Sequence, residues 1–214
     1  MFLLAGLGAC FAGFPAAAAD LDAGGLTFRD FAVNDNGASF GRGVDPMAAG
    51  GPNQVSSRIA TIDNAQGLAR VQFDSIRVEV ALPLGWQATE DWERGVAYSG
   101  DKRYRLIVWR VDFAFEGVKD AEHYAATKSG SIQARRPSIR AQARKLDDGI
   151  FLIVYENVPR GQGDSEPRTV FDLLLQRPNN PKEGILMTLG VPTSDAVRGL
   201  KFLALLKQNL RINW

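Results

Sequence analysis

Apolar and polar residues alternate in several segments of this chain, and a period of two predicts half-buried β-strands. In residues 75–82, Ile76 and Val80 fall on one face while Arg77 and Glu79 fall on the other. Similar patterns, separated by turn residues, predict three hairpins, which pair residues 95–99 with 103–115, 138–146 with 150–158, and 169–176 with 184–191. Short strands are also predicted at residues 26–33 and 210–214.

Two segments have the periodicity of amphipathic helices. In the first, Asp120 is a good N-cap, and apolar residues recur at helical spacing until Pro137 on a face that also carries Lys128. In the second, residues 193–195 offer caps for a helix that runs to about Gln208. Antiparallel strands in succession, interrupted by two helices, predict an α+β fold, an antiparallel sheet with helices packed on its faces.

The first twenty residues have the pattern of a secretory signal peptide, residues 1–19. An apolar run over residues 2–14 leads into four alanines and Asp20, which predicts cleavage after Ala19. The run is shorter than the roughly 18 residues that cross a membrane as a helix, so we expect no integral membrane span in the mature chain. A lipid anchor at Cys10 is the alternative, because the residues before it resemble a lipobox. We expect a periplasmic or secreted protein.

The chain changes character after the signal peptide. Residues 34–54 are rich in Gly, Asn, Asp, Pro and Ala and hold few large apolar side chains that could bury surface. We predict that residues 20–54 form an N-terminal strand followed by a flexible segment. Residues 55–214 are predicted to form a single α+β domain, since 214 residues of 45% hydrophobic composition suffice for one well-filled core.

Charge and residue types exclude several classes of function. Lys and Arg total 25 against 24 acidic residues, a net charge of +1, so no global field draws the protein to nucleic acid. Cleavage after Ala19 removes the only cysteine and leaves His123 as the only histidine. A metal site would need further ligands, since carboxylates without histidine or thiolate support zinc poorly, and no Gly-x-Ser-x-Gly elbow offers His123 a catalytic partner. We therefore expect no metal, no cofactor and no catalytic residue.

The order of the predicted elements resembles the PsbP-like superfamily over residues 75–214. The resemblance includes the turn Leu82-Pro83-Leu84-Gly85-Trp86 and a helix that opens at Asp120-Ala121-Glu122. This superfamily takes in PsbP of photosystem II, the Mog-type Ran-binding import factors and bacterial envelope proteins of the DcrB type. The resemblance implies an α/β/α sandwich about an antiparallel sheet, and a non-enzymatic role in binding or in stabilising a larger assembly.

A basic run without an intervening acid extends from His123 to Leu146. If residues 138–146 form a strand, Arg140 and Arg144 project from one face, and the planar fork of arginine suits carboxylate or phosphate. A solvated strand edge is the alternative, because charges there also discourage unwanted strand pairing. The candidate residues for binding a partner or an anion are Arg135, Arg136, Arg140, Arg144 and Lys145.

We therefore expect an exported, non-catalytic binding or accessory protein of the bacterial cell envelope that engages a protein partner. One alternative is a glycan hydrolase that uses Glu90, Asp91 and Glu93 beside Trp86 and Trp92, although spacing alone does not show that two carboxylates face each other. The other alternative is a module that binds anionic lipid or glycan through the basic run.

Overall fold

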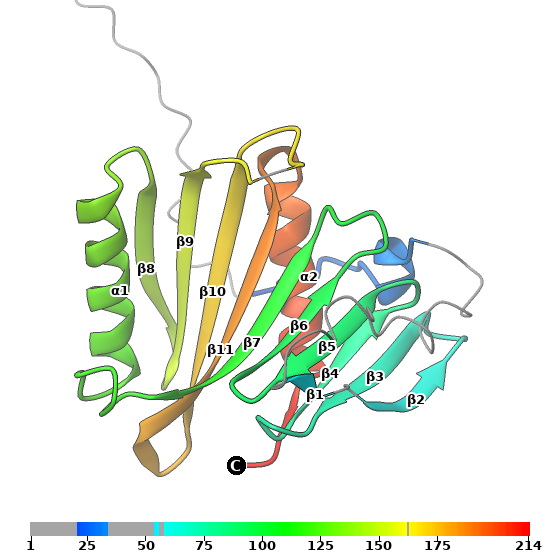
Figure 1. Ribbon diagram of the computed structural model, residues 1–214, viewed down its shortest axis with the longest axis horizontal. Coiled ribbons are helices and arrows are strands. Elements are labelled where there is room, and N and C mark those ends of the chain that lie inside the picture. Colours follow the sequence, from blue (N-terminus) through cyan, green and yellow to red (C-terminus); the bar gives the residue numbers. More distant parts are fainter. Residues whose placement is uncertain (1–20, 34–53, 56–57, 162) are drawn as a thin grey trace, which may run out of the picture.

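Antiparallel hairpins build the larger of two sheets in the computed structural model, which describes residues 21–33, 54–55, 58–161 and 163–214 (Figure 1). The predicted signal peptide, Cys10 and residues 34–53 lie outside the described residues. The larger sheet has the strand order β1-β5-β6-β7-β11-β10-β9-β8. Its strands are β1 (Gln54–Val55), β5 (Gln87–Asp91), β6 (Arg94–Tyr98), β7 (Arg105–Asp112), β8 (Arg140–Asp147), β9 (Ile150–Val158), β10 (Arg168–Arg177) and β11 (Asn180–Pro192).

The three predicted hairpins are confirmed, as the pairs β6–β7, β8–β9 and β10–β11. The predicted helices are confirmed as well, as α1 (Ala121–Arg135) and α2 (Ala196–Gln208). Asp120 caps α1, since its carboxylate accepts a hydrogen bond from the backbone N–H of His123 at 2.8 Å. A short 3₁₀ turn, η3 (Thr193–Asp195), precedes α2. The α+β architecture predicted from the pattern is therefore correct.

The smaller sheet was only partly predicted. It has the order β12-β4-β3-β2, in which β4 (Val78–Pro83) and β12 (Arg211–Ile212) match predicted strands. The other two strands, β2 (Arg58–Asp63) and β3 (Leu68–Phe73), were not predicted. Most of β2 is exposed, so its sequence lacks the alternation that burial of one face imposes.

The strand predicted at residues 26–33 is wrong, because this segment contains the 3₁₀ helix η1 (Phe28–Phe31). Asp30 accepts hydrogen bonds from the backbone N–H and the hydroxyl of Thr27, which closes the turn. A 3₁₀ turn places Phe28 and Phe31 on the same side. Both rings are buried, and the centroid of Phe31 lies 4.5 Å from that of Phe202 on α2. The N-terminal segment thus contributes to the core.

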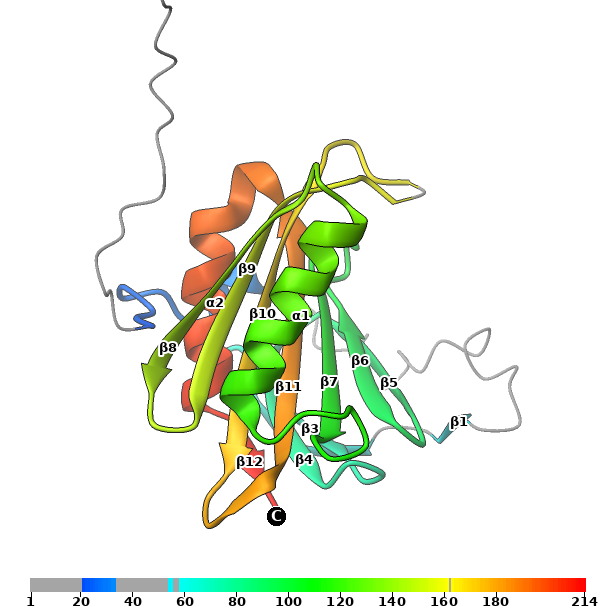
Figure 2. The same cartoon turned by 90° about the vertical axis from the view of Figure 1, so that its left-hand side faces the viewer.

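The two faces of the larger sheet are covered differently. On one face α2 and the smaller sheet enclose the main core, in which Trp86, Phe73 and Phe202 are fully buried. On the other face α1 packs on β8, β9, β10 and β11 over a smaller core that includes Phe113 and Phe151. In Figure 2, α1 stands in front of one half of the sheet, while β5, β6 and β7 lie beside it. We call the first face the closed face and the second the open face.

Candidate functional site

A groove of about 1160 Å³ lies on the open face, between α1 and the strands that α1 leaves uncovered. Alternate residues of a strand point to the same face, and the register places Trp109 opposite Leu186 and Ile107 opposite Thr188. Thr188 is in turn paired with Asp172 of β10. These five residues line the groove. The floor is therefore apolar except for one hydroxyl and one carboxylate.

Large aromatic side chains surround the groove. Trp92 is 63% exposed and Phe115 is 89% exposed, although both are strongly apolar. Trp109 carries the guanidinium of Arg94 above its ring, 5.0 Å from the centroid. Tyr124 of α1 adds a fourth ring on the opposite wall. Exposed aromatics that flank a hollow are typical of an interaction site rather than of an ordinary protein surface.

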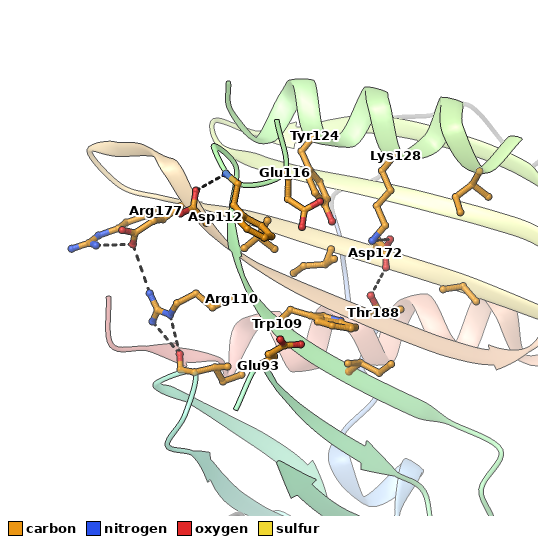
Figure 3. A pocket seen from close by; sticks show the side chains of 18 of the residues that line it. Glu93, Trp109, Arg110, Asp112, Glu116, Tyr124, Lys128, Asp172, Arg177 and Thr188 are labelled. Carbon is orange, nitrogen blue, oxygen red and sulfur yellow. Dashed lines mark hydrogen bonds and ion pairs between the residues drawn. The ribbon is translucent and has the colours of Figure 1, made fainter. Parts of the chain in front are cut away.

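A buried ion pair lies between α1 and the floor of the groove (Figure 3). The ammonium nitrogen of Lys128 is 2.9 Å from a carboxylate oxygen of Asp172, whose side chain is 2% exposed. The hydroxyl of Thr188 donates to the other carboxylate oxygen at 2.5 Å. Lys128 also lies over the ring of Tyr124, 5.5 Å from the centroid. The carboxylate of Asp172 is thus neutralised and hydrogen-bonded, as a buried charge must be.

Titration behaviour around this pair favours a fixed protonation state near neutral pH. Burial acts to lower the pKa of Lys128, but the charge of Asp172 and the neighbouring hydrogen bonds outweigh it, so the pKa lies above its ordinary value. Burial raises the pKa of Tyr124 and that of Tyr155, and the charge of Asp172 raises both further. Lysine therefore stays protonated and both tyrosines stay neutral. Such groups suit holding and orienting a ligand rather than transferring protons.

One end of the groove is bordered by a network around Glu183. This carboxylate lies 2.8 Å from a guanidinium nitrogen of Arg177 and 3.8 Å from one of Arg110. Arg110 also donates to the carbonyl oxygens of Ile76 and Asn213 at 3.0 and 3.1 Å. It thereby joins the larger sheet to the turn before β4 and to the C-terminal residues. This border of the groove is held by charge and hydrogen bonds, in contrast to the aromatic rim.

The structure does not bring the five predicted basic residues together on one surface. Arg140 and Arg144 are on the face of β8 whose partners in β9 include Leu152 of the main core, whereas Lys145 is opposite Phe151, on the α1 side. Arg140 is paired with Glu156 and Lys145 with Asp148. The remaining two belong to the C-terminal end of α1, where Arg135 closes the helix, and Arg136 lines the groove.

The carboxylates considered for hydrolysis also point in different directions. Glu90 is 1% exposed and accepts a hydrogen bond from the backbone N–H of Ser75 at 3.1 Å. Asp91 is paired with Arg94 at 2.9 Å, and Glu93 lines the groove. Trp86 is fully buried and donates its indole N–H to the carbonyl oxygen of Phe31.

His123 is an exposed residue of the first turn of α1. Within the described residues, no group of three or more His, Cys, Asp or Glu side chains is placed to hold a metal ion. None of the helices in the same residues is long and apolar enough to cross a membrane.

Sequence reasoning missed the partners of Lys128. The helical spacing placed this lysine on the apolar face of α1, where an unpaired ammonium would be costly. A second signal was Asp172, a single charge within the apolar run of β10. Two opposite charges at inward positions predict an ion pair when their elements pack together. That packing is a tertiary contact, which the pattern of either segment alone does not contain.

The comparison with known proteins concerns the fold. No protein-family model matches the sequence, and no curated protein matches it. The structure is similar to Ran-binding protein Mog1p of Saccharomyces cerevisiae, with a TM-score of 0.47 and 11% identity, over 68% of this chain and 95% of that one. It is also similar to cyanobacterial PsbP (CyanoP) of Synechocystis, with a TM-score of 0.45 and 13% identity, over 69% and 93%. These are two of the three groups that the sequence resemblance named, while the fold class stated above rests on the strands and helices themselves.

Proposed function

We propose that this protein is a non-catalytic binding or accessory protein that holds a protein partner in the groove on its open face. The carrying observation is the aromatic rim, in which Trp92 and Phe115 expose most of their surface beside a hollow of about 1160 Å³. Aromatic side chains are enriched at the centres of protein interfaces, because they bury a large area at a small cost in conformational entropy. A bound partner would remove these rings from water.

The polar groups of the groove support binding rather than chemistry. The charges of Lys128 and Asp172 neutralise each other, and the hydroxyl of Thr188 is already donated to Asp172. A nucleophile needs an adjacent base with a suitable pKa, and these groups are engaged with one another instead. We infer that the pair fixes the position of α1 over the sheet and so sets the width of the groove.

The proposed place of action is the bacterial cell envelope, with the mature protein periplasmic or secreted. The support is the apolar run and the alanine-rich cleavage site before Asp20. Mass spectrometry of the protein from the periplasmic fraction should find an N-terminus at Asp20. An acylated N-terminus at Cys10 would instead mean a tethered protein, and an intact N-terminus in a cytoplasmic fraction would contradict export.

Site-specific photo-crosslinking in the cells that produce the protein tests the proposed function. A photoreactive phenylalanine analogue replaces Phe115 in one variant and Val197 in a matched control. Val197 is 60% exposed and lies on α2, which covers the closed face on the side of the sheet opposite the groove. We expect a discrete adduct from position 115, identified by mass spectrometry as one protein, and none from position 197. Equal adducts from both positions, or none from position 115, would overturn the assignment of the groove.

A further inference from the structure

The groove continues into a second hollow of about 800 Å³ toward the loop that joins β6 and β7. The two hollows share four of their lining residues: Ile107, Val158, Val170 and Thr188. They are therefore two parts of one elongated trough on the open face. An elongated trough accommodates a stretch of chain better than a small compact molecule, which needs a pocket that encloses it.

One strand shows how the trough is laid out. Residues Val111, Trp109, Ile107 and Arg105 are alternate positions of β7, so they point to the same face and follow one another along the trough. Six residues of strand separate Val111 from Arg105, which corresponds to about 20 Å. An extended peptide of about six or seven residues has the same length. Along this line the surface changes from aromatic to cationic.

Charge distinguishes the two ends of the trough. At the aromatic end the lining holds five cations and five acids, so its charges are balanced in number. At the far end four cations, Lys102, Arg103, Arg105 and Arg168, line the hollow with three acids, Asp101, Asp164 and Glu166. Asp164 is paired with Arg168, Glu166 accepts two hydrogen bonds from Ser194, and Asp101 accepts from Ser99 and from the backbone of Arg103.

Two cations at the far end are left without an acidic partner. Lys102 and Arg105 form no ion pair with any residue that the structure describes. The guanidinium of Arg105 lies over the ring of Tyr98, 5.7 Å from its centroid, which orients it without neutralising it. The contrast is Arg94, which lies over Trp109 in the same way but is paired with Asp91. The lining of the far end therefore holds one more cation than acids, whereas the lining of the aromatic end is balanced.

We propose that the trough takes an extended polypeptide segment of the partner, with aromatic side chains at the Trp92 end and acidic side chains at the Arg105 end. The inference rests on the proposed function and specifies the chemistry of the partner. The floor favours a polypeptide over a glycan, because Ile107, Val170 and Leu186 offer branched apolar surface rather than hydrogen bonds for hydroxyl groups. Charge complementarity fixes the direction in which the segment lies.

Labelled random copolymers of amino acids provide the probe. Fluorescence anisotropy measures the affinity of the purified protein for poly(Glu,Tyr), poly(Lys,Tyr) and poly(Glu,Ala) at one ionic strength. We expect poly(Glu,Tyr) to bind at least about tenfold more tightly than either of the others, since only it offers both chemistries. Equal affinity for poly(Lys,Tyr) would overturn the acidic assignment, and equal affinity for poly(Glu,Ala) would overturn the aromatic one.

Variants assign the two ends separately. Arg105→Glu should weaken binding of poly(Glu,Tyr) about tenfold and strengthen binding of poly(Lys,Tyr), a gain that a misfolded protein would not show. Trp92→Ala should weaken poly(Glu,Tyr) binding, because it removes an exposed ring at the end of the trough where the aromatic side chains of the segment are proposed to bind. Arg58→Glu and Val197→Ala are the controls, since both residues are exposed on other elements, and they should leave binding unchanged.

The remaining outcomes separate this inference from the proposed function. If no copolymer binds while position 115 still crosslinks to a partner in cells, the segment chemistry is wrong and the proposed function stands. If no copolymer binds and no adduct forms, both are wrong. Self-association of the protein that Trp92→Ala abolishes would assign the trough to a second copy of this chain and overturn the inference.

Discussion

Among the residues that the structure describes, each face of the larger sheet buries one carboxylate, and the surroundings of the two differ. On the open face, Asp172 is paired with Lys128 and accepts the hydroxyl of Thr188. On the closed face, Glu90 accepts one backbone N–H, and its second oxygen is buried without a hydrogen-bond partner. The charge of Asp172 is therefore offset by that of Lys128, whereas burial raises the pKa of Glu90 and favours its neutral form.

This difference matches the way each face is built. The closed face is enclosed by α2 and the smaller sheet, and its core is almost entirely apolar. The open face is covered by α1 over half of its width, so Lys128 at the margin of α1 remains partly exposed while it pairs with the buried Asp172. Stability therefore resides mainly in the closed face, and the open face is available for recognition. Substitutions on the two faces should therefore differ in their effect on stability.

Truncation of the closed core should have the largest effect. Phe202 is fully buried, and its ring lies within 4.5–6.4 Å of the rings of Phe31, Trp86, Tyr104 and Phe28. Phe202→Ala should lower the free energy of unfolding by about 3–5 kcal/mol, as for other buried phenylalanines. Urea denaturation measures this change. Phe115→Ala is the matched control and should cost less than about 0.5 kcal/mol; similar losses for both would contradict the division.

Breaking the ion pair between Lys128 and Asp172 should lower the free energy of unfolding by less than Phe202→Ala does. The loss should differ between substitution of the lysine and substitution of the aspartate. Lys128→Met leaves Asp172 buried without a counter-ion and should lower the free energy of unfolding by about 3 kcal/mol. Asp172→Asn should cost less than Lys128→Met, because the side chain of Lys128 is 29% exposed and its ammonium can reach water. Urea denaturation of both variants gives the order. The reverse order would mean that Asp172 has access to solvent.

Replacement of the closed-face carboxylate should have a small effect that depends on pH. The pKa of Glu90 is raised by burial, against which the N–H of Ser75 acts to lower it, so the folded protein holds this proton more tightly than the unfolded chain. The wild type therefore loses stability as the pH rises from 4.5, the ordinary value, through the raised pKa of Glu90. The glutamine of the variant Glu90→Gln does not titrate. The free energy of unfolding of this variant should therefore rise relative to that of the wild type between pH 4 and pH 7. An advantage that shrinks with rising pH would contradict the raised pKa.

The sequence predicts three hairpins of the larger sheet and both helices, because the physical signals for these elements are local. Alternation at β4, the turn between β8 and β9, and the N-cap Asp120 each depend on a few neighbouring residues. Burial of one strand face or one helix face imposes a periodic pattern, and the pattern can be read without knowing what covers it. The hairpins and both helices therefore agree with the structure.

The candidate site was not predicted, because it depends on what fails to cover the sheet. Ile107, Trp109 and Leu186 have the same apolar character as residues that α1 covers, so their pattern does not reveal an open face. The basic run was a candidate binding surface, with a solvated strand edge as the alternative, because its residues are close in sequence. In the structure these residues are divided between the end of α1 and the strand β8. Within β8, period-two alternation directs Arg144 and Lys145 to opposite faces. The 3₁₀ helix η1 was predicted as a strand because a segment of four residues is too short for its apolar pattern to distinguish a helical period from a period of two.

The double variant Trp92→Ala/Phe115→Ala separates binding from stability, since it alters only the exposed rim of the groove. Two quantities are measured on it: the free energy of unfolding in urea, and the yield of the in-cell adduct from a photoreactive residue at Ile132, which also lines the groove. We expect stability within about 1 kcal/mol of the wild type and loss of the adduct. Lost stability with an undiminished adduct would show that the rings support the fold and that the partner does not bind there.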